Sequence, residues 1–124
     1  PIARKHFDPI VEGMQMVIKE GTGRRAQIDS ITIAGKTGTV QNPHGDDHSV
    51  FIAFAPVENP KIALIVYVEN GVWGSRYAAP IAGLLIEKYL KGKISDRKKP
   101  LEKEMFQGSL IHNTTSKVKE TSNE

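Results

Sequence analysis

Two β-type runs separated by only five residues constrain the fold more than any other feature of the sequence. Residues 49–55 (SVFIAFA) and 61–69 (KIALIVYVE) are rich in β-branched and aromatic side chains, which favour strands. Parallel strands need a crossover of about a dozen residues or more, so this pair predicts an antiparallel hairpin. Because residues 61–69 are apolar on both faces, they further predict a central strand that is covered on both sides.

A third strand is expected upstream, over residues 31–40. This segment reads ITIAGKTGTV, and a polar loop follows it over residues 41–48, with Pro43 and Gly45 as turn residues. The apolar positions of residues 31–34 therefore lead directly into a glycine- and threonine-rich stretch on the same strand.

An amphipathic helix is predicted before these strands. Asp8 is suited to the N-cap and Pro9 to the first turn, and apolar residues then recur at helical spacing. Gly21 and Gly23 are expected to end the helix, because glycine accepts the left-handed conformation that is common at a helix C-terminus.

A second, more apolar helix is predicted after the strands, from about residue 77 or 80 to residue 90, with Gly92 as its stop. The order helix, strand, strand, strand, helix indicates an α+β fold, with antiparallel strands covered by N- and C-terminal helices. Three strands and two helices cover one face of a sheet fully but hardly two. We therefore expect missing chain, or a second copy in a homo-oligomer, to pack on this incomplete sheet.

The basic excess of the chain lies entirely after residue 90. Residues 1–90 hold nine Lys and Arg and nine Asp and Glu, whereas residues 91–124 hold eight and five, which accounts for the net charge of +3. Basic residues that are mixed with acids and nearly without aromatics favour a solvated tail over a nucleic-acid surface. The sequence thus predicts one folded portion over residues 1–92 and a polar, disordered tail over residues 93–124.

The functional interpretation depends on a KTGT motif in the third strand. With the glycine before it, the motif contains the Gly-Lys-Thr of a phosphate-binding loop. That loop also requires a glycine where Ser30 stands and a helix after the Lys-Thr pair, so the phosphate interpretation fails. By itself the motif is better explained as a solvated lysine on an edge strand. The four residues are Lys36, Thr37, Gly38 and Thr39.

The segments around the motif resemble the end of class B penicillin-binding transpeptidases. The matching phrases are GKTGTVQNPHG at 35–45, HS at 48–49, FIAFAP at 51–56, YVENG at 67–71 and WG at 73–74. Within that class the chain most resembles penicillin-binding protein 2 of the cell-elongation type, over about residues 6–91. Val50 departs from the pattern, which has a tryptophan before Phe51. The resemblance implies part of a β-lactamase/transpeptidase-like fold.

The same resemblance implies a peptidoglycan D,D-transpeptidase that acts through an acyl-serine and binds penicillin and other β-lactams. Its substrate is a stem peptide that ends in D-Ala-D-Ala. Lys36 would supply positive charge near the nucleophile, and the hydroxyls of Thr37 and Thr39 would bind the terminal carboxylate. Gly38 would let the substrate approach the backbone, and the N–H of Thr39 would form half of the oxyanion hole. These implied roles make Lys36 and Thr39 catalytic and all four residues substrate-binding.

The nucleophile that this family requires is not found upstream of the motif. The family carries S-x-x-K and S-x-N before K-T-G, and the only upstream serine, Ser30, matches neither. A literal match at Ser95 and Lys98 lies in the charged tail, where nothing is expected to bury the lysine, so we interpret it as a chance match. The chain alone is therefore expected to be inactive. Two alternatives remain, a non-enzymatic structural remnant and the end piece of a serine β-lactamase.

Two further features lie outside the motif. His44, Asp46, Asp47 and His48 are residue types that bind metals, but they lack the spacing of a known site. We expect their loop to shape the rim of a cleft, with no metal or cofactor. Trp73 is expected to pack over the last helix.

The resemblance also implies a location and partners. It places the parent protein on the extracytoplasmic, periplasmic side of the bacterial inner membrane, anchored by a segment outside this chain. The cell-elongation machinery would be its protein partner.

Overall fold

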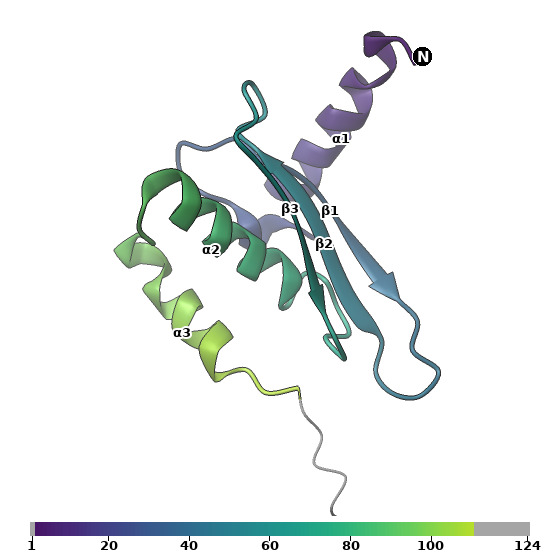
Figure 1. The fold of residues 1–124 in the computed structure, drawn as a ribbon, viewed down its shortest axis with the longest axis vertical. Helices are drawn as coiled ribbons and strands as arrows, with labels where there is room; N and C mark the ends of the chain where they lie inside the picture. The colour runs from purple at the N-terminus through teal and green to yellow at the C-terminus, as the bar shows by residue number, and fades with distance from the viewer. Residues whose placement is uncertain (1, 111–124) are drawn as a thin grey trace, which may run out of the picture.

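The computed structural model describes residues 2–110. Its helices and strands are α1 (Asp8–Lys19), β1 (Ala34–Val40), β2 (His48–Ala55), β3 (Ile62–Val68), α2 (Ala78–Lys91) and α3 (Lys99–Gln107). Single turns of 3-10 helix lie outside them, η1 (Arg4–His6), η2 (Arg24–Ala26) and η3 (Asp96–Lys98). As Figure 1 shows, α2 crosses one face of the sheet, α1 packs beside β1, and α3 packs against α2. This arrangement confirms the predicted α+β class. No helix within residues 2–110 is long and apolar enough to span a bilayer.

The three strands form one antiparallel sheet in the order β1-β2-β3. The register aligns Thr37 with Phe51, and Phe51 in turn with Val66. β2 and β3 are the predicted hairpin, since the connection between them is too short for a crossover. β2 is therefore the central strand, and β1 and β3 are the edges within the described part of the chain.

The core lies between this sheet and α2. Phe51 is completely buried and packs in one cluster with Ala82 and Ile86 of α2. α2 also lies very close to η2, and a small residue at Gly83 makes this possible. A Cβ added at Gly83 would lie 2.8 Å from the Cα of Ala26 in η2. A larger residue at Gly83 would therefore separate α2 from η2.

Strand alternation assigns each side chain of β1 to one face of the sheet. Thr37 pairs with the core residue Phe51, so Thr37 and Thr39 belong to the inner face, which we define as the face that α2 covers. Lys36 pairs with Ile52, which is 44% exposed, and belongs to the opposite, outer face. The motif thus divides between the two faces.

Both ends of α1 differ from the prediction. Phe7, rather than Asp8, occupies the N-cap position, and no side chain caps this end. Neither Gly21 nor Gly23 takes the left-handed conformation. Gly21 is needed for space instead, since an added Cβ would lie 2.9 Å from the Cα of Val17. The glycines therefore end the helix through a close chain reversal, which the sequence pattern did not distinguish from a left-handed cap.

Within residues 2–110, the prediction that β3 is a central strand covered on both sides is wrong. β3 is an edge strand whose residues alternate between the two faces, with Val66 buried, Ile65 66% exposed and Tyr67 49% exposed. An apolar run indicates that both faces avoid water in the complete environment of the strand. It does not say which segment covers them, and no helix described here packs on the outer face of β3.

The predicted disordered tail begins instead with an ordered helical segment. α2 stops at Gly92, as predicted, with a φ of 76°, and α3 then packs back against α2. Arg25 donates two hydrogen bonds to the carboxylate of Glu104, at 2.8 and 2.7 Å. The prediction of disorder is therefore wrong for residues 96–107, because charged side chains that were read as solvated pair with groups of the folded portion. Residues 111–124 lie outside the described residues.

Candidate functional site

The KTGT motif lies on β1, an edge strand of the sheet. Half of the backbone N–H and C=O groups of an edge strand point away from its neighbour. The exposed Lys36 donates a hydrogen bond from Nζ to the carbonyl oxygen of Thr37 at 2.7 Å. The ammonium group therefore stays at the strand instead of extending into solvent, so positive charge and free backbone groups lie together.

Thr37 contacts a residue that sequence reasoning missed. Its Oγ1 lies 2.7 Å from Oγ1 of Thr22, which belongs to the segment between α1 and η2. Thr22 therefore adds another hydroxyl at the motif. The only sequence signal was a threonine between Gly21 and Gly23, and nothing in that signal indicates that the turn folds back onto β1.

The two glycines of β1 have different physical roles. A Cβ added at Gly35 would lie 2.6 Å from Cζ of Phe51, so the core requires a glycine there. A Cβ added at Gly38 would meet only Cβ of Val50, at 3.6 Å. Only Gly38 therefore has open space beside it through which a ligand could approach the backbone.

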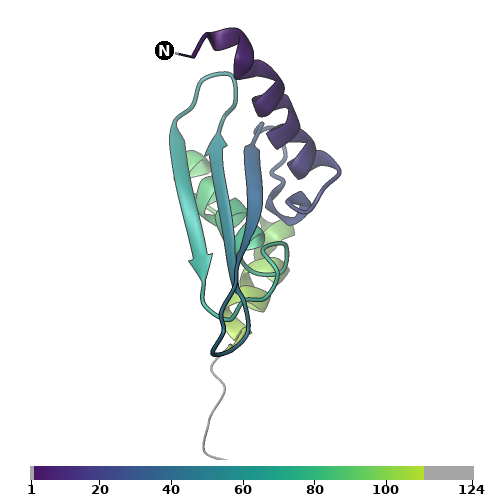
Figure 2. The same cartoon turned by 90° about the vertical axis from the view of Figure 1, so that its right-hand side faces the viewer.

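The loop after β1 is tied to the turn after β3 by a hydrogen-bond network. The Asn42 side chain donates to Oδ1 of Asn70 at 3.3 Å, and the Asn42 backbone N–H donates to Oδ1 of Asp47 at 3.0 Å. The backbone N–H of Asn70 donates to Nδ1 of His48 at 3.0 Å, and that of Val72 donates to the Asp47 carbonyl at 2.8 Å. Both loops lie at the same end of the sheet (Figure 2), so they form one connected rim there.

This rim holds two residues in the left-handed conformation. Asn70 has a φ of 55° and Val72 a φ of 56°. The conformation is tolerated by asparagine but strained for a β-branched valine. The hydrogen bond from Val72 to Asp47 is one of the contacts that hold this strained backbone in place.

The histidine and aspartate side chains of the loop, which are residue types that bind metals, make contacts with different neighbours. His48 accepts the hydrogen bond from Asn70 and lies with its ring centroid 5.4 Å from that of Tyr67. Asp47 accepts from Asn42, and His44 is exposed. Within residues 2–110, no three His, Asp or Glu side chains come close enough together to hold a metal ion.

The prediction that Trp73 packs over the last helix is wrong, because its side chain is 67% exposed. Its neighbour makes the packing contact instead. A Cβ added at Gly74 would lie 2.8 Å from the carbonyl oxygen of Val50 and 3.2 Å from Cβ of Thr37. The turn after β3 therefore closes against Thr37 through a glycine.

Lys98 is more buried than the sequence suggested. Burial lowers the pKa of Lys98, and the nearby carboxylate of Glu87 partly offsets this effect. The expectation that nothing would bury this lysine is therefore wrong. Its Nζ donates to the backbone carbonyl of Gln27, and within residues 2–110 no hydrogen bond joins it to the hydroxyl of Ser95. The Ser95–Lys98 pair lies beside α2 and η2, not on the sheet with Lys36.

Residues 1–87 match the protein family described as the penicillin binding protein transpeptidase domain. The peptidoglycan D,D-transpeptidase MrdA of Haemophilus influenzae is 37% identical over 100 residues, which make up 66% of this chain and 15% of that protein. The peptidoglycan D,D-transpeptidase PbpA of Mycobacterium tuberculosis is 41% identical over 105 residues, 73% of this chain and 21% of that protein. The chain thus spans only 15% and 21% of the length of these two relatives.

Solved structures give the same result. PBP2 of Pseudomonas aeruginosa in complex with WCK 5153 superposes with a TM-score of 0.66 at 36% identity, covering 80% of this chain and 23% of that one. The imipenem acyl-enzyme complex of penicillin-binding protein A from M. tuberculosis superposes with a TM-score of 0.63 at 35% identity, covering 72% and 20%. Since the family match covers more than half of the chain, this protein belongs to the penicillin-binding protein transpeptidases, and the MrdA, PbpA and PBP2 proteins named above support its placement in class B.

Proposed function

We propose that this chain supplies the substrate-binding strand of a peptidoglycan D,D-transpeptidase that works through an acyl-serine intermediate. The observation that carries the proposal is the composition of β1, in which an exposed lysine, an unobstructed glycine and two threonines follow one another along an edge strand. The relatives named above support it, since they are peptidoglycan D,D-transpeptidases, and one related structure is an acyl-enzyme with the β-lactam imipenem.

Each residue of the motif has a proposed role. The stem peptide ending in D-Ala-D-Ala lies along the free edge of β1 and exchanges backbone hydrogen bonds with it. The hydroxyls of Thr37 and Thr39 share the inner face and bind the terminal carboxylate, while Gly38 leaves room for the substrate. The N–H of Thr39 is half of the oxyanion hole. Lys36 provides positive charge close to the nucleophile and assists proton transfer.

Thr22 extends this set of residues. Its hydroxyl lies within hydrogen-bonding distance of Thr37, so it holds the Thr37 side chain in one orientation. A hydroxyl that is fixed in advance loses less entropy when it binds a carboxylate. We therefore include Thr22 as a positioning residue of the proposed site.

We further propose that the 124-residue chain alone forms no acyl-enzyme. Its sequence has no S-x-x-K or S-x-N before Lys36, so the nucleophile and the other half of the oxyanion hole must come from another segment. The portion of the transpeptidase domain within this chain extends over residues 1–92. The parent protein acts on the extracytoplasmic side of the bacterial inner membrane, is anchored by a segment outside this chain, and works with the cell-elongation machinery.

Exposure to a fluorescent penicillin, followed by intact-mass measurement, tests the proposal. We expect a covalent adduct on a full-length parent that contains S-x-x-K and none on the 124-residue chain. An adduct on the chain would show that it contains its own nucleophile, and an adduct on Ser95 in particular would overturn the interpretation of that serine. Absence of labelling on the full-length parent would remove the transpeptidase assignment.

Variants of the full-length parent test the individual roles. Thr37→Val removes a hydrogen bond to a charged group, which is worth about 1.5–3 kcal/mol, so the acylation rate should fall roughly 10- to 100-fold. Thr32→Val makes the same chemical change outside β1 and should leave the rate unchanged. Thr22→Val should have an intermediate effect. If all three variants acylate at the same rate, the hydroxyls of this site bind no carboxylate.

A further inference from the structure

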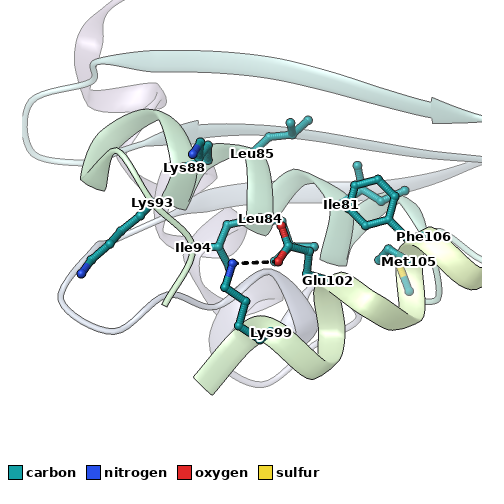
Figure 3. A pocket seen from close by; sticks show the side chains of 10 residues that line it. All are labelled: Ile81, Leu84, Leu85, Lys88, Lys93, Ile94, Lys99, Glu102, Met105 and Phe106. Atoms are coloured by element: carbon teal, nitrogen blue, oxygen red, sulfur yellow. Dashed lines mark hydrogen bonds and ion pairs between the residues drawn. The ribbon is translucent and has the colours of Figure 1, made fainter. Parts of the chain in front are cut away.

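An apolar cavity of about 430 Å³ lies between α2 and α3, and none of the motif residues lines it. Ile81, Leu84 and Leu85 of α2 form one wall, and Met105 and Phe106 of α3 form the other (Figure 3). The volume falls within the range of small-molecule sites, roughly 300–1,000 Å³. Leu85 is 51% and Phe106 86% exposed, so the described chain leaves this surface accessible.

The charged groups of the cavity are unevenly distributed. In Figure 3, Lys88 and Lys93 lie at the end where α2 turns toward α3, whereas Met105 and Phe106 lie at the other end. Lys99 forms an ion pair with Glu102 at 3.1 Å. No ion pair within residues 2–110 involves Lys88 or Lys93. The lining therefore has three lysines and one glutamate, a net charge of +2. Lys88 and Lys93, the two lysines without an ion pair among the described residues, both come from the end where α2 turns toward α3.

We propose that this cavity binds a single-chain anionic amphiphile, a fatty-acid carboxylate. The alkyl chain lies between the apolar walls of α2 and α3, and the carboxylate lies at the end that carries Lys88 and Lys93. A groove of about 430 Å³ between two helices presents an apolar wall on either side of a single alkyl chain. The flexible lysine stems can follow a carboxylate at the mouth of the groove, as point charges on four-carbon chains.

The charge pattern favours this occupant over a neutral one. An uncharged alkyl chain would use the apolar walls but would leave Lys88 and Lys93 without partners. The inference does not depend on the proposed transpeptidase function, because residues 36–39 take no part in the cavity. An experiment that disproves the cavity proposal therefore does not affect the proposed transpeptidase function, and the reverse also holds.

Isothermal titration calorimetry of the 124-residue chain with octanoate, decanoate and dodecanoate, below their micelle-forming concentrations, tests the proposal. We expect saturable binding of one molecule per chain, with the Kd falling about fourfold for each added methylene, because each one leaves water for an apolar wall. The neutral analogue 1-dodecanol should bind more weakly than dodecanoate.

Two sets of variants, each with its own control, locate the site. Lys88→Gln and Lys93→Gln should each weaken dodecanoate binding about two- to fivefold, the usual worth of an exposed ion pair. Lys103→Gln, an exposed lysine of α3 that does not line the cavity, should have no effect. Leu85→Gln should weaken binding of the alkyl chain, whereas Tyr89→Gln, also exposed on α2 but outside the cavity, should not. Circular dichroism of each variant verifies that it is folded.

Three results would overturn the proposal. They are the absence of saturable dodecanoate binding, equal affinity for 1-dodecanol, and binding that both lysine variants leave unchanged. If the first of these results is accompanied by saturable binding of an acidic amphipathic helical peptide, the groove is instead a site for a polypeptide.

Discussion

β1 and β3 are the two edges of one sheet, yet they present different surfaces. β1 reads AGKTGTV, and its exposed positions carry Lys36, Thr39 and Val40. β3 reads IALIVYV, and its outer face exposes Ile65 and Tyr67. Both strands are attached to the core through β2, so the difference arises from the side chains and not from the position in the sheet.

This difference indicates what each edge accommodates. Small and polar residues along an edge leave its backbone accessible to an extended peptide. Isoleucine and tyrosine side chains exposed on an edge strand instead favour association, and natural proteins usually cover such an edge. We interpret β1 as the edge for the substrate and β3 as the edge for protein, either the rest of a longer chain or a second copy.

The largest expected effect distinguishes the two glycines within β1. Gly35→Ala should lower the free energy of unfolding by about 1–3 kcal/mol, the usual cost of overpacking, because the new Cβ would lie 2.6 Å from Cζ of Phe51 and 2.9 Å from the carbonyl oxygen of Ile52. Gly38→Ala, with its open surroundings, should cost less than ~1 kcal/mol. Urea denaturation measures both. If both variants lose the same free energy of unfolding, the space beside Gly38 is no more open than that beside Gly35.

The second test weakens the link between the two edges. Asn42→Ala removes the side-chain hydrogen bond to Asn70, together with those that join Asn42 to the Asp46 carbonyl and to the His44 N–H. We expect the free energy of unfolding to fall by at least about 1 kcal/mol. Faster amide hydrogen exchange should appear at Asn70 and Val72, beyond β3, and not only in the loop after β1. Asn59→Ala, an exposed asparagine at the other end of the sheet, is the control. Exchange that changes only near residue 42 would mean that the edges are independent.

A smaller effect on stability is expected on the outer face of β3. Ile65→Lys should change the free energy of unfolding by less than ~0.5 kcal/mol, since this side chain is 66% exposed. It should nevertheless reduce self-association in sedimentation velocity, because a charge on an edge strand opposes pairing with another copy. Ile10→Lys, on the exposed side of α1, should leave association unchanged. If the two variants associate equally, a second copy does not cover β3, and the rest of a longer chain is then the partner of this edge.

The smallest expected effect is pH-dependent and lies where the chain enters β1. The hydroxyl of Thr32 donates to Oε2 of Glu58 at 2.5 Å, and this hydrogen bond lowers the pKa of Glu58 below its ordinary value of 4.5. A carboxyl pKa that is lowered in the folded state stabilises the fold above the unfolded pKa, and this stabilisation is lost as the pH falls through the folded pKa.

The difference in Tm between the parent chain and Glu58→Gln should therefore be present at pH 7 and shrink as the solution is acidified below pH 4.5. Thr32→Val should show the same pH-dependent part, together with a constant part from the lost hydrogen bond between the Val57 N–H and the Thr32 hydroxyl. A Tm difference that does not change with pH would mean that this hydrogen bond is absent in solution.

The local features of this protein were predictable from the sequence. The hairpin of β2 and β3 followed from β-type runs and a short connection, and the stop of α2 followed from Gly92. The position of the KTGT motif on a strand, and the family itself, followed from residues that are adjacent in the chain. These features depend on backbone conformation and short-range spacing, which a sequence expresses directly.

Only the tertiary structure decided which distant segments meet. Thr22 and Thr37 are 15 positions apart, and Arg25 and Glu104 are 79 apart. Neither pair has a periodic signal, so the placement of Thr22 at the motif and the docking of α3 could not be foreseen. The exposed face of β3 has the same cause, since hydrophobicity indicates that a surface avoids water but not which partner covers it. Composition and local pattern thus determined the elements and the family, whereas packing determined the surroundings of the site.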